Sequence, residues 1–182
     1  MKLSKLILAS ASMLLTANLS FAADATTSHD KLTAAEVGDL ATVAVIDKSE
    51  ILIGVVASNK KISSDVIDFA NMMITQHGNN LTQILEMVNN LHVPALQGGD
   101  SDKLATGGKK ALMTLGALQG DQFATAYVNA MVTGHQAALD LIDQHLMKNA
   151  KSETMKNFLT ATRTVVAQHL EDAKKLQDKM QH

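Results

Sequence analysis

Apolar residues recur at intervals of three and four along most of the chain, which is the spacing of one face of an α-helix. Four long segments carry such an apolar stripe: 33–59, 63–91, 121–149 and 152–179. A weaker helical segment, 101–118, contains the pair Gly107-Gly108. Thr33 and Glu36 have the spacing of a capping box, which marks the start of the first helix. We therefore predict an all-α protein whose helices bury their stripes against one another.

The lengths of the connections predict how these helices are arranged. Short connections after 33–59 and after 121–149 indicate two helical hairpins. The connection between 63–91 and 121–149 is long enough to run back along the molecule, as the crossover of ferritin-like folds does. We expect a four-helix up-down bundle over residues 33–180, ferritin-like, with a short extra helix in the long connection between the second and third helices.

The first residues have the order of a secretory signal peptide. Lys2 and Lys5 precede an apolar run that starts at Leu6, and small residues follow this run. We expect a signal peptide at 1–22, with cleavage as late as residue 25, and then a flexible lead at 23–32. The apolar run is shorter than the roughly 20 residues of a membrane-spanning helix. The expected mature protein has no transmembrane span and is periplasmic or otherwise exported, with outer-membrane association left open.

Composition excludes several classes of function. The formal net charge of −2, which becomes more negative if Lys2 and Lys5 are removed, argues against a nucleic-acid partner. The chain has no cysteine, so thiolate chemistry and iron–sulfur clusters are excluded. It also lacks a nucleophile elbow, a phosphate-binding glycine loop and the His-Glu-x-x-His motif. An enzyme of the hydrolase or nucleotide-binding classes therefore has no support.

Three histidines interrupt the apolar stripes, one on each of three predicted helices: His77, His135 and His169. Glu50 continues the stripe of the first helix. At a rise of about 1.5 Å per residue, all four positions fall near the middle of their helices and at similar heights. One carboxylate and three imidazoles could then bind zinc, copper or iron. The alternative is a structural polar core in which neutral histidines form hydrogen bonds with carbonyls or other side chains, or satisfy one another.

Residues near the histidines bear on which metal such a site would take. Met73 and Met131 lie one helical turn before His77 and His135, and their thioethers would suit copper, although methionine is also a common core filler. A dinuclear iron site needs glutamate three residues before its histidines. Those positions hold apolar side chains instead: Ile74, Val132 and Val166. Ferritin-type iron oxidation is therefore disfavoured.

Three stretches, together with the export signal, resemble one family. They are Phe-Ala-x-x-Met-Ile-x-x-His from Phe69 to His77, Tyr-Val-x-Ala-Met-Val-x-x-His from Tyr127 to His135, and His169-Leu170. They are similar to the bacterial exported domain-of-unknown-function family 4142, over about 35–177. The resemblance implies a ferritin-like helical bundle of the cell envelope, without an established activity. Members usually carry Asp directly before the first two histidines, where this chain has Gln76 and Gly134. The resemblance therefore carries over no acid that orients a ring or binds a metal.

Two hypotheses of function follow. The first is a non-enzymatic periplasmic binding or envelope-stress protein, with an envelope protein or a second copy of the chain as partner and with the histidines in its core. The second is a metal-binding bundle that uses Glu50, His77, His135 and His169 as ligands. An unidentified transition metal is the cofactor in the second hypothesis only.

Overall fold

The computed structural model describes residues 31–93 and 96–181. The expected signal peptide (1–22) and most of the expected lead (23–32) lie outside the described residues. The described residues form the helices α1 (Ala34–Ser58), α2 (Ser64–Asn90), α3 (Ser101–Gly116), α4 (Gly120–Leu141) and α6 (Glu153–Lys179). The helix α4 continues through a π-helical turn, η1 (Ile142–Leu146), and the short α5 (Met147–Asn149). These residues contain no strand, so the all-α prediction is confirmed, and the helix bounds agree closely with the predicted ranges.

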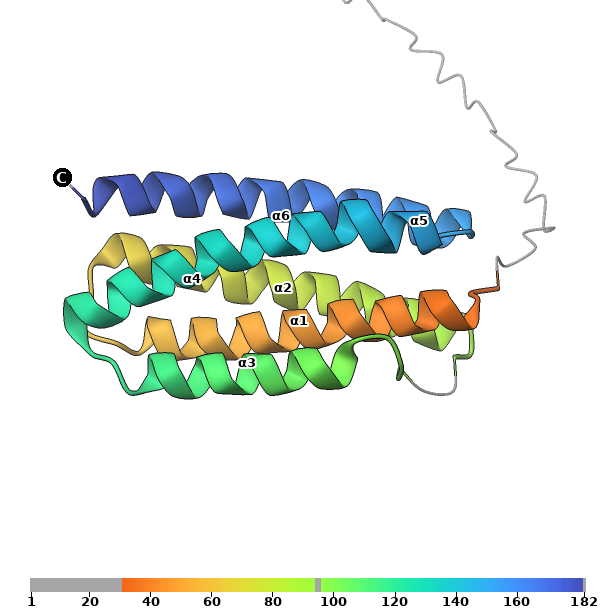
Figure 1. Cartoon of the computed structure of the whole chain (residues 1–182), viewed down its shortest axis with the longest axis horizontal. Helices are drawn as coiled ribbons and strands as arrows, with labels where there is room; N and C mark the ends of the chain where they lie inside the picture. Colours follow the sequence, from red (N-terminus) through yellow and green to blue (C-terminus); the bar gives the residue numbers. More distant parts are fainter. Residues whose placement is uncertain (1–30, 94–95, 182) are drawn as a thin grey trace, which may run out of the picture.

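The helices lie side by side along the longest axis of the molecule (Figure 1). α1 and α2 pack together, as do α4 and α6, so both predicted hairpins are present. α3 lies against α1 and runs back from the end where α2 stops to the end where α4 begins (Figure 1). As a result α2 and α4 run in the same direction. No helix in the described part of the chain has the length and apolarity needed to cross a membrane.

Glu36 ties the start of α1 to the start of α6. The predicted capping box is confirmed: Thr33 Oγ1 accepts a hydrogen bond from the Glu36 N–H (3.2 Å), and Glu36 Oε2 accepts one from the Thr33 N–H (2.7 Å). Glu36 Oε1 accepts three more, from the N–H groups of Lys151 (2.9 Å) and Ser152 (2.8 Å) and from the Ser152 hydroxyl (2.8 Å). Burial raises the pKa of this carboxyl, but the hydrogen bonds outweigh burial and lower the pKa to about 2.

Glycines allow α3 and the segment before it to lie close to α1. A Cβ at Gly108 would stand 2.3 Å from Ser49 Oγ and 2.9 Å from Ser49 Cβ on α1. Gly99 has a φ of +59°, and a Cβ there would stand 2.7 Å from the Gly38 carbonyl oxygen. The left-handed backbone at Gly99 and the absent side chains at both positions therefore set how closely α3 approaches α1.

The core consists of two apolar clusters with a polar layer between them. One cluster includes Phe69, Met73, Phe123, Tyr127 and Ala173. The other includes Leu40, Val43, Ile142, Leu146 and Phe158. Along each of α1, α2, α4 and α6, one buried polar residue falls between the two clusters: Asp47, His77, His135 and His169. The prediction that the three histidines face inward is thereby confirmed.

Candidate functional site

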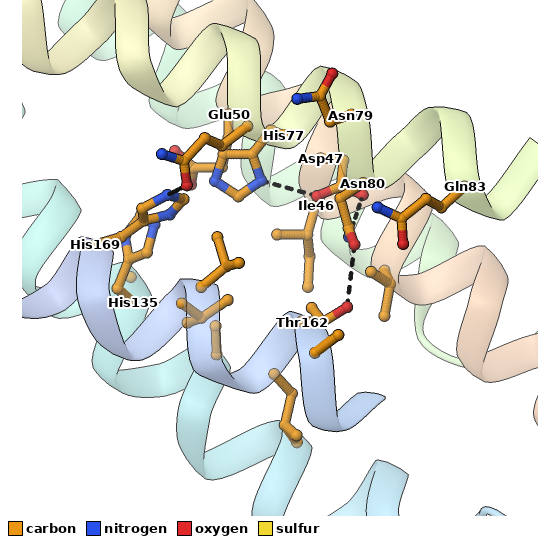
Figure 2. A pocket seen from close by; sticks show the side chains of 18 of the residues that line it. Ile46, Asp47, Glu50, His77, Asn79, Asn80, Gln83, His135, Thr162 and His169 are labelled. Atoms are coloured by element: carbon orange, nitrogen blue, oxygen red, sulfur yellow. Dashed lines mark hydrogen bonds and ion pairs between the residues drawn. The ribbon is translucent and has the colours of Figure 1, made fainter. Parts of the chain in front are cut away.

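The three histidines meet in the middle of the molecule, and we call them the histidine cluster (His77, His135 and His169). Their ring centroids are 5.2 Å apart for His77 and His169, 5.3 Å for His135 and His169, and 5.9 Å for His77 and His135. The three residues are 5%, 3% and 0% exposed, respectively. One nitrogen from each ring lies within 4.8 Å of the other two. Figure 2 shows the three side chains gathered at one end of a cavity.

His77 is held by a buried carboxylate from α1. His77 Nδ1 donates to Asp47 Oδ1 at 2.8 Å, and Asp47 Oδ2 accepts a hydrogen bond from Asn80 Nδ2 at 2.9 Å. Asn80 Oδ1 in turn accepts one from the Thr162 hydroxyl at 3.0 Å, so the network connects α1, α2 and α6 (Figure 2). The bond to Asp47 occupies Nδ1 of His77, so Nε2 is the ring nitrogen left for another partner. This Nε2 is buried and has no hydrogen-bond partner among the described residues.

His135 is held by its own helix. Its Nδ1 donates to the carbonyl oxygen of Met131, one turn earlier on α4, at 2.8 Å. Its Nε2 consequently carries the lone pair. The pKa of His135 is lowered to about 4, mainly by burial, which the bond to Met131 opposes and the nearby His77 reinforces. The ring is therefore neutral at neutral pH.

His169 is held by a side-chain amide. His169 Nε2 donates to Gln76 Oε1 at 2.9 Å, which leaves the lone pair on Nδ1. This Nδ1 is also buried without a partner among the described residues. Burial lowers the pKa of His169 to about 3, with further contributions from His77 and His135. This ring, too, is neutral at neutral pH.

The three rings do not hydrogen-bond to one another. Each ring donates an N–H to a different acceptor, which is a carboxylate for His77, a backbone carbonyl for His135 and an amide for His169. These are the partners that the structural alternative expects, a carbonyl or another side chain, whereas hydrogen bonds between the rings are not the arrangement found. The second nitrogen of each ring remains, and a cation could bind between these three nitrogens.

Glu50, the carboxylate predicted as a fourth ligand, lies beside the cluster. It lines the same cavity, and its Oε2 is buried without a partner among the described residues. Burial raises its pKa, an effect that His77 opposes and Asp47 reinforces. The group of ligand atoms that lie within 4.8 Å of one another nevertheless consists of the three histidines and does not include Glu50.

The two methionines considered for copper are core residues. Met73 and Met131 are 0% and 2% exposed and pack in the cluster of Phe69, Phe123 and Tyr127. Neither is among the described residues that line the cavity. His145, on η1, is exposed to solvent.

Sequence reasoning missed three residues that orient the histidines: Asp47, Gln76 and Asn80. Asp47 had a usable signal, because it lies four residues after Val43 and three before Glu50 and so shares their helical face. Gln76 does not lie on the apolar stripe of its helix. It meets His169 only because α6 crosses α2. The groups that bind the three rings are thus Asp47 from another helix, the Gln76 amide and a backbone carbonyl.

These features define a class: an all-α protein with a buried layer of polar side chains that centres on three histidines. The chain belongs to the family described as Domain of unknown function (DUF4142), whose model matches residues 21–176. No curated protein and no solved structure matches the chain.

Proposed function

We propose that this protein binds one divalent transition-metal ion through His77, His135 and His169. The observation that carries the proposal is the hydrogen bonding of the rings: each histidine donates through one nitrogen and keeps the other as a lone pair within a group only 4.8 Å across. Two of these lone pairs are buried without partners among the described residues. Buried polar atoms are ordinarily satisfied, so this set calls for a ligand.

The residues behind the rings support the same proposal. A metal-ligating histidine generally donates its second nitrogen to a carboxylate, a carbonyl or water, which fixes the tautomer and the orientation of the ring. Asp47, the Met131 carbonyl and the Gln76 amide fill these places for the three rings. A carboxylate behind His77 also makes that imidazole a stronger donor.

The dimensions fit a metal after a small contraction. Zinc–nitrogen bonds of about 2.0–2.1 Å in tetrahedral geometry place the ligand nitrogens roughly 3.4 Å apart. The rings would close from 4.8 Å by side-chain rotation of about an ångström. Glu50 is our candidate for the fourth ligand when no other molecule occupies that place, because its buried Oε2 has no partner among the described residues. Imidazole donors suit zinc, iron and copper(II), whereas placement of Met73 and Met131 in the apolar cluster speaks against a thioether site for copper(I).

The fold and the location complete the proposal. α1, α2, α4 and α6 would constitute a ferritin-like four-helix bundle, with α3 as the additional helix. The parallel course of α2 and α4, and the return of the chain between them along α1, support this assignment. The signal-peptide pattern at 1–22 supports a role as an exported, non-enzymatic metal-binding protein of the cell envelope.

Metal stoichiometry tests the proposal. The mature chain is stripped with a chelator, equilibrated with Zn²⁺, desalted and analysed for bound zinc by elemental mass spectrometry. We expect about one zinc per chain for the wild type, and a large loss for His77→Ala and for His169→Ala. His145→Ala removes an exposed histidine of the same chain and should keep the wild-type value. Circular dichroism verifies that each variant is folded. Wild-type protein that retains no zinc, or a His77→Ala variant that retains all of it, would contradict the proposal.

A further inference from the structure

A cavity of about 540 Å³ extends from the histidine cluster between α2, α4 and α6. Close-packed interiors hold few voids larger than a water molecule, and a volume of this size is typical of small-molecule sites. Its lining includes residues that reach solvent on α2 and α6, among them Asn79, Gln83 and Val165, and these mark its opening. Figure 2 shows the interior of this cavity, with the histidines at one end.

The cavity has one polar and one apolar end. The polar end holds the histidine cluster, Asp47 and Glu50, and two of the cluster's buried nitrogens are without partners among the described residues. Away from this end the walls from α1, α4 and α6 are mostly aliphatic, with Ile46, Leu141 and Val166, while Asn80, Gln83 and Thr162 add polar groups on one side (Figure 2). Along α4 the lining runs from His135 to Leu146, which at about 1.5 Å per residue corresponds to roughly 16 Å. The space is therefore elongated and amphiphilic.

Local backbone structure contributes to the apolar end. The π-helical turn η1 supplies two of its wall residues, Ile142 and Leu146, both 3% exposed. Turns of this type widen a helix by one residue and are frequent at functional sites. Small residues face the same space, namely Gly134 and Ala138 on α4 and Ala161 on α6. Their size leaves room that larger side chains would fill.

We infer that this cavity binds a linear medium-chain carboxylate, with its apolar chain along η1 and α6 and its carboxylate at the histidine cluster. The inference rests on the proposed function, because the metal ion supplies the positive charge that binds the carboxylate. Among the described residues, the lining has no lysine or arginine that could take the place of the metal. The aliphatic walls select an unbranched hydrocarbon chain over a polar or aromatic ligand of the same charge.

Decanoate is the probe, and isothermal titration calorimetry of the zinc-loaded and metal-free full-length mature protein is the measurement. We expect one decanoate per zinc-loaded chain, and binding at least tenfold weaker to the metal-free protein. Decanol, which lacks the carboxylate, should bind equally to both forms. Hexanoate should bind more than tenfold more weakly than decanoate, because each buried methylene adds to affinity. With cobalt in place of zinc, decanoate but not decanol should alter the visible absorption spectrum.

A matched pair of variants locates the ligand. Ala138→Phe fills the middle of the cavity without removing a histidine and should weaken decanoate binding at least tenfold while zinc stoichiometry is unchanged. Ala137→Phe adds the same bulk at the exposed neighbouring position and should have no effect on either. Decanoate binding that is unaffected by Ala138→Phe would overturn the assignment of the cavity.

The two proposals can fail separately. Protein that holds one zinc but binds no decanoate overturns the inference and leaves the proposed function standing. A second outcome is protein that holds no zinc but binds decanoate and decanol equally, and loses both with Ala138→Phe. This outcome overturns the proposed function and the proposal that the carboxylate binds a metal. Protein that binds neither zinc nor any of the chain-like probes overturns both.

Discussion

Asp47 on α1 and His77 on α2 form a buried contact, with Asp47 Oδ1 2.8 Å from His77 Nδ1 and side chains that are 3% and 6% exposed. The contact fixes the imidazole in the tautomer whose Nε2 lone pair faces the other histidines. Because Asp47 also binds Asn80, and Asn80 binds Thr162, the orientation of this one ring is supported by three helices. The site is therefore built from the packing of the helices rather than from any local motif.

Replacement of Asp47 by asparagine should weaken metal binding without removing a proposed ligand. An asparagine has only one side-chain oxygen, which can still accept from His77 Nδ1. Its NH₂ group would then face the NH₂ group of Asn80, and the hydrogen bond between these two residues would be lost. We expect the Kd for Zn²⁺ to rise by about 10- to 100-fold, the usual effect of losing the group behind a ligating histidine. Competition with a chromophoric chelator measures this Kd.

Asp39→Asn is the matched control for that substitution. Asp39 is another buried acid of α1, 8% exposed, and it lies outside the lining of the cavity. Its replacement should leave the zinc Kd within about twofold of the wild-type value. Equal weakening in both variants would mean that the effect comes from general destabilisation of α1 and not from the contact with His77.

Glu36→Gln should destabilise the protein markedly. The carboxylate accepts four hydrogen bonds, three from Lys151 and Ser152 and one from the Thr33 N–H of its own cap, and the amide would turn an NH₂ group toward at least one buried N–H donor. Losing charge-assisted hydrogen bonds and leaving a buried donor without an acceptor should lower the free energy of unfolding by roughly 2–4 kcal/mol. Urea denaturation gives the free energy of unfolding. Glu86→Gln, at an exposed position of α2, should change it by no more than about 0.5 kcal/mol.

Periodicity predicted most of this fold, and the reason is physical. Helix bounds are set by local signals, such as the Thr33–Glu36 capping box, and the inward direction of the histidines follows from stripes at helical spacing. The π-helical turn at Ile142–Leu146 had no such signal, because one additional residue in a turn leaves composition and polarity unchanged. Asp47 was overlooked in favour of Glu50, although both lie on one helical face. The partner of a buried polar atom depends on how two helices cross, and spacing along one helix does not contain that information.

Acid should destabilise the metal-free protein well above the range where carboxylates titrate. The unfolded chain takes up a proton on each histidine near pH 6.5, whereas folded His135 and His169 do so only at about 4 and 3. The unfolded state therefore binds more protons, and the free energy of unfolding falls as the pH is lowered from about 6.5. Below pH 4.5 the unfolded chain also takes up a proton on Glu36, whose pKa is about 2 in the folded protein, and the free energy of unfolding falls further.

His135→Gln isolates the histidine contribution in a series of urea denaturations in the presence of a chelator. Between pH 6.5 and pH 5, its free energy of unfolding should fall less than that of the wild type by roughly 1–2 kcal/mol, since one pKa unit corresponds to about 1.4 kcal/mol. His145→Gln, at an exposed position, should follow the wild-type curve. Parallel curves for all three proteins would show that His135 is not held neutral by burial.

Two adjacent glycines of α3 should respond in opposite directions to alanine. A Cβ at Gly107 meets no atom within 4 Å, so Gly107→Ala gains the helix propensity of alanine, about 0.5–1 kcal/mol, at no steric cost. At Gly108 the same methyl would stand 2.9 Å from Ser49 Cβ, an atom fixed to the backbone of α1, so α3 must move away from α1. We expect Gly108→Ala to lower the free energy of unfolding by about 1–3 kcal/mol despite the same gain in propensity. Thermal denaturation of the two variants against the wild type measures both signs at once.

A stabilising Gly108→Ala would mean that α3 does not pack on α1 at this distance. In a chain that carries Ser49→Gly, which removes the opposing Cβ, adding Gly108→Ala should cost much less than it does in the wild type, because the two changes meet at one contact.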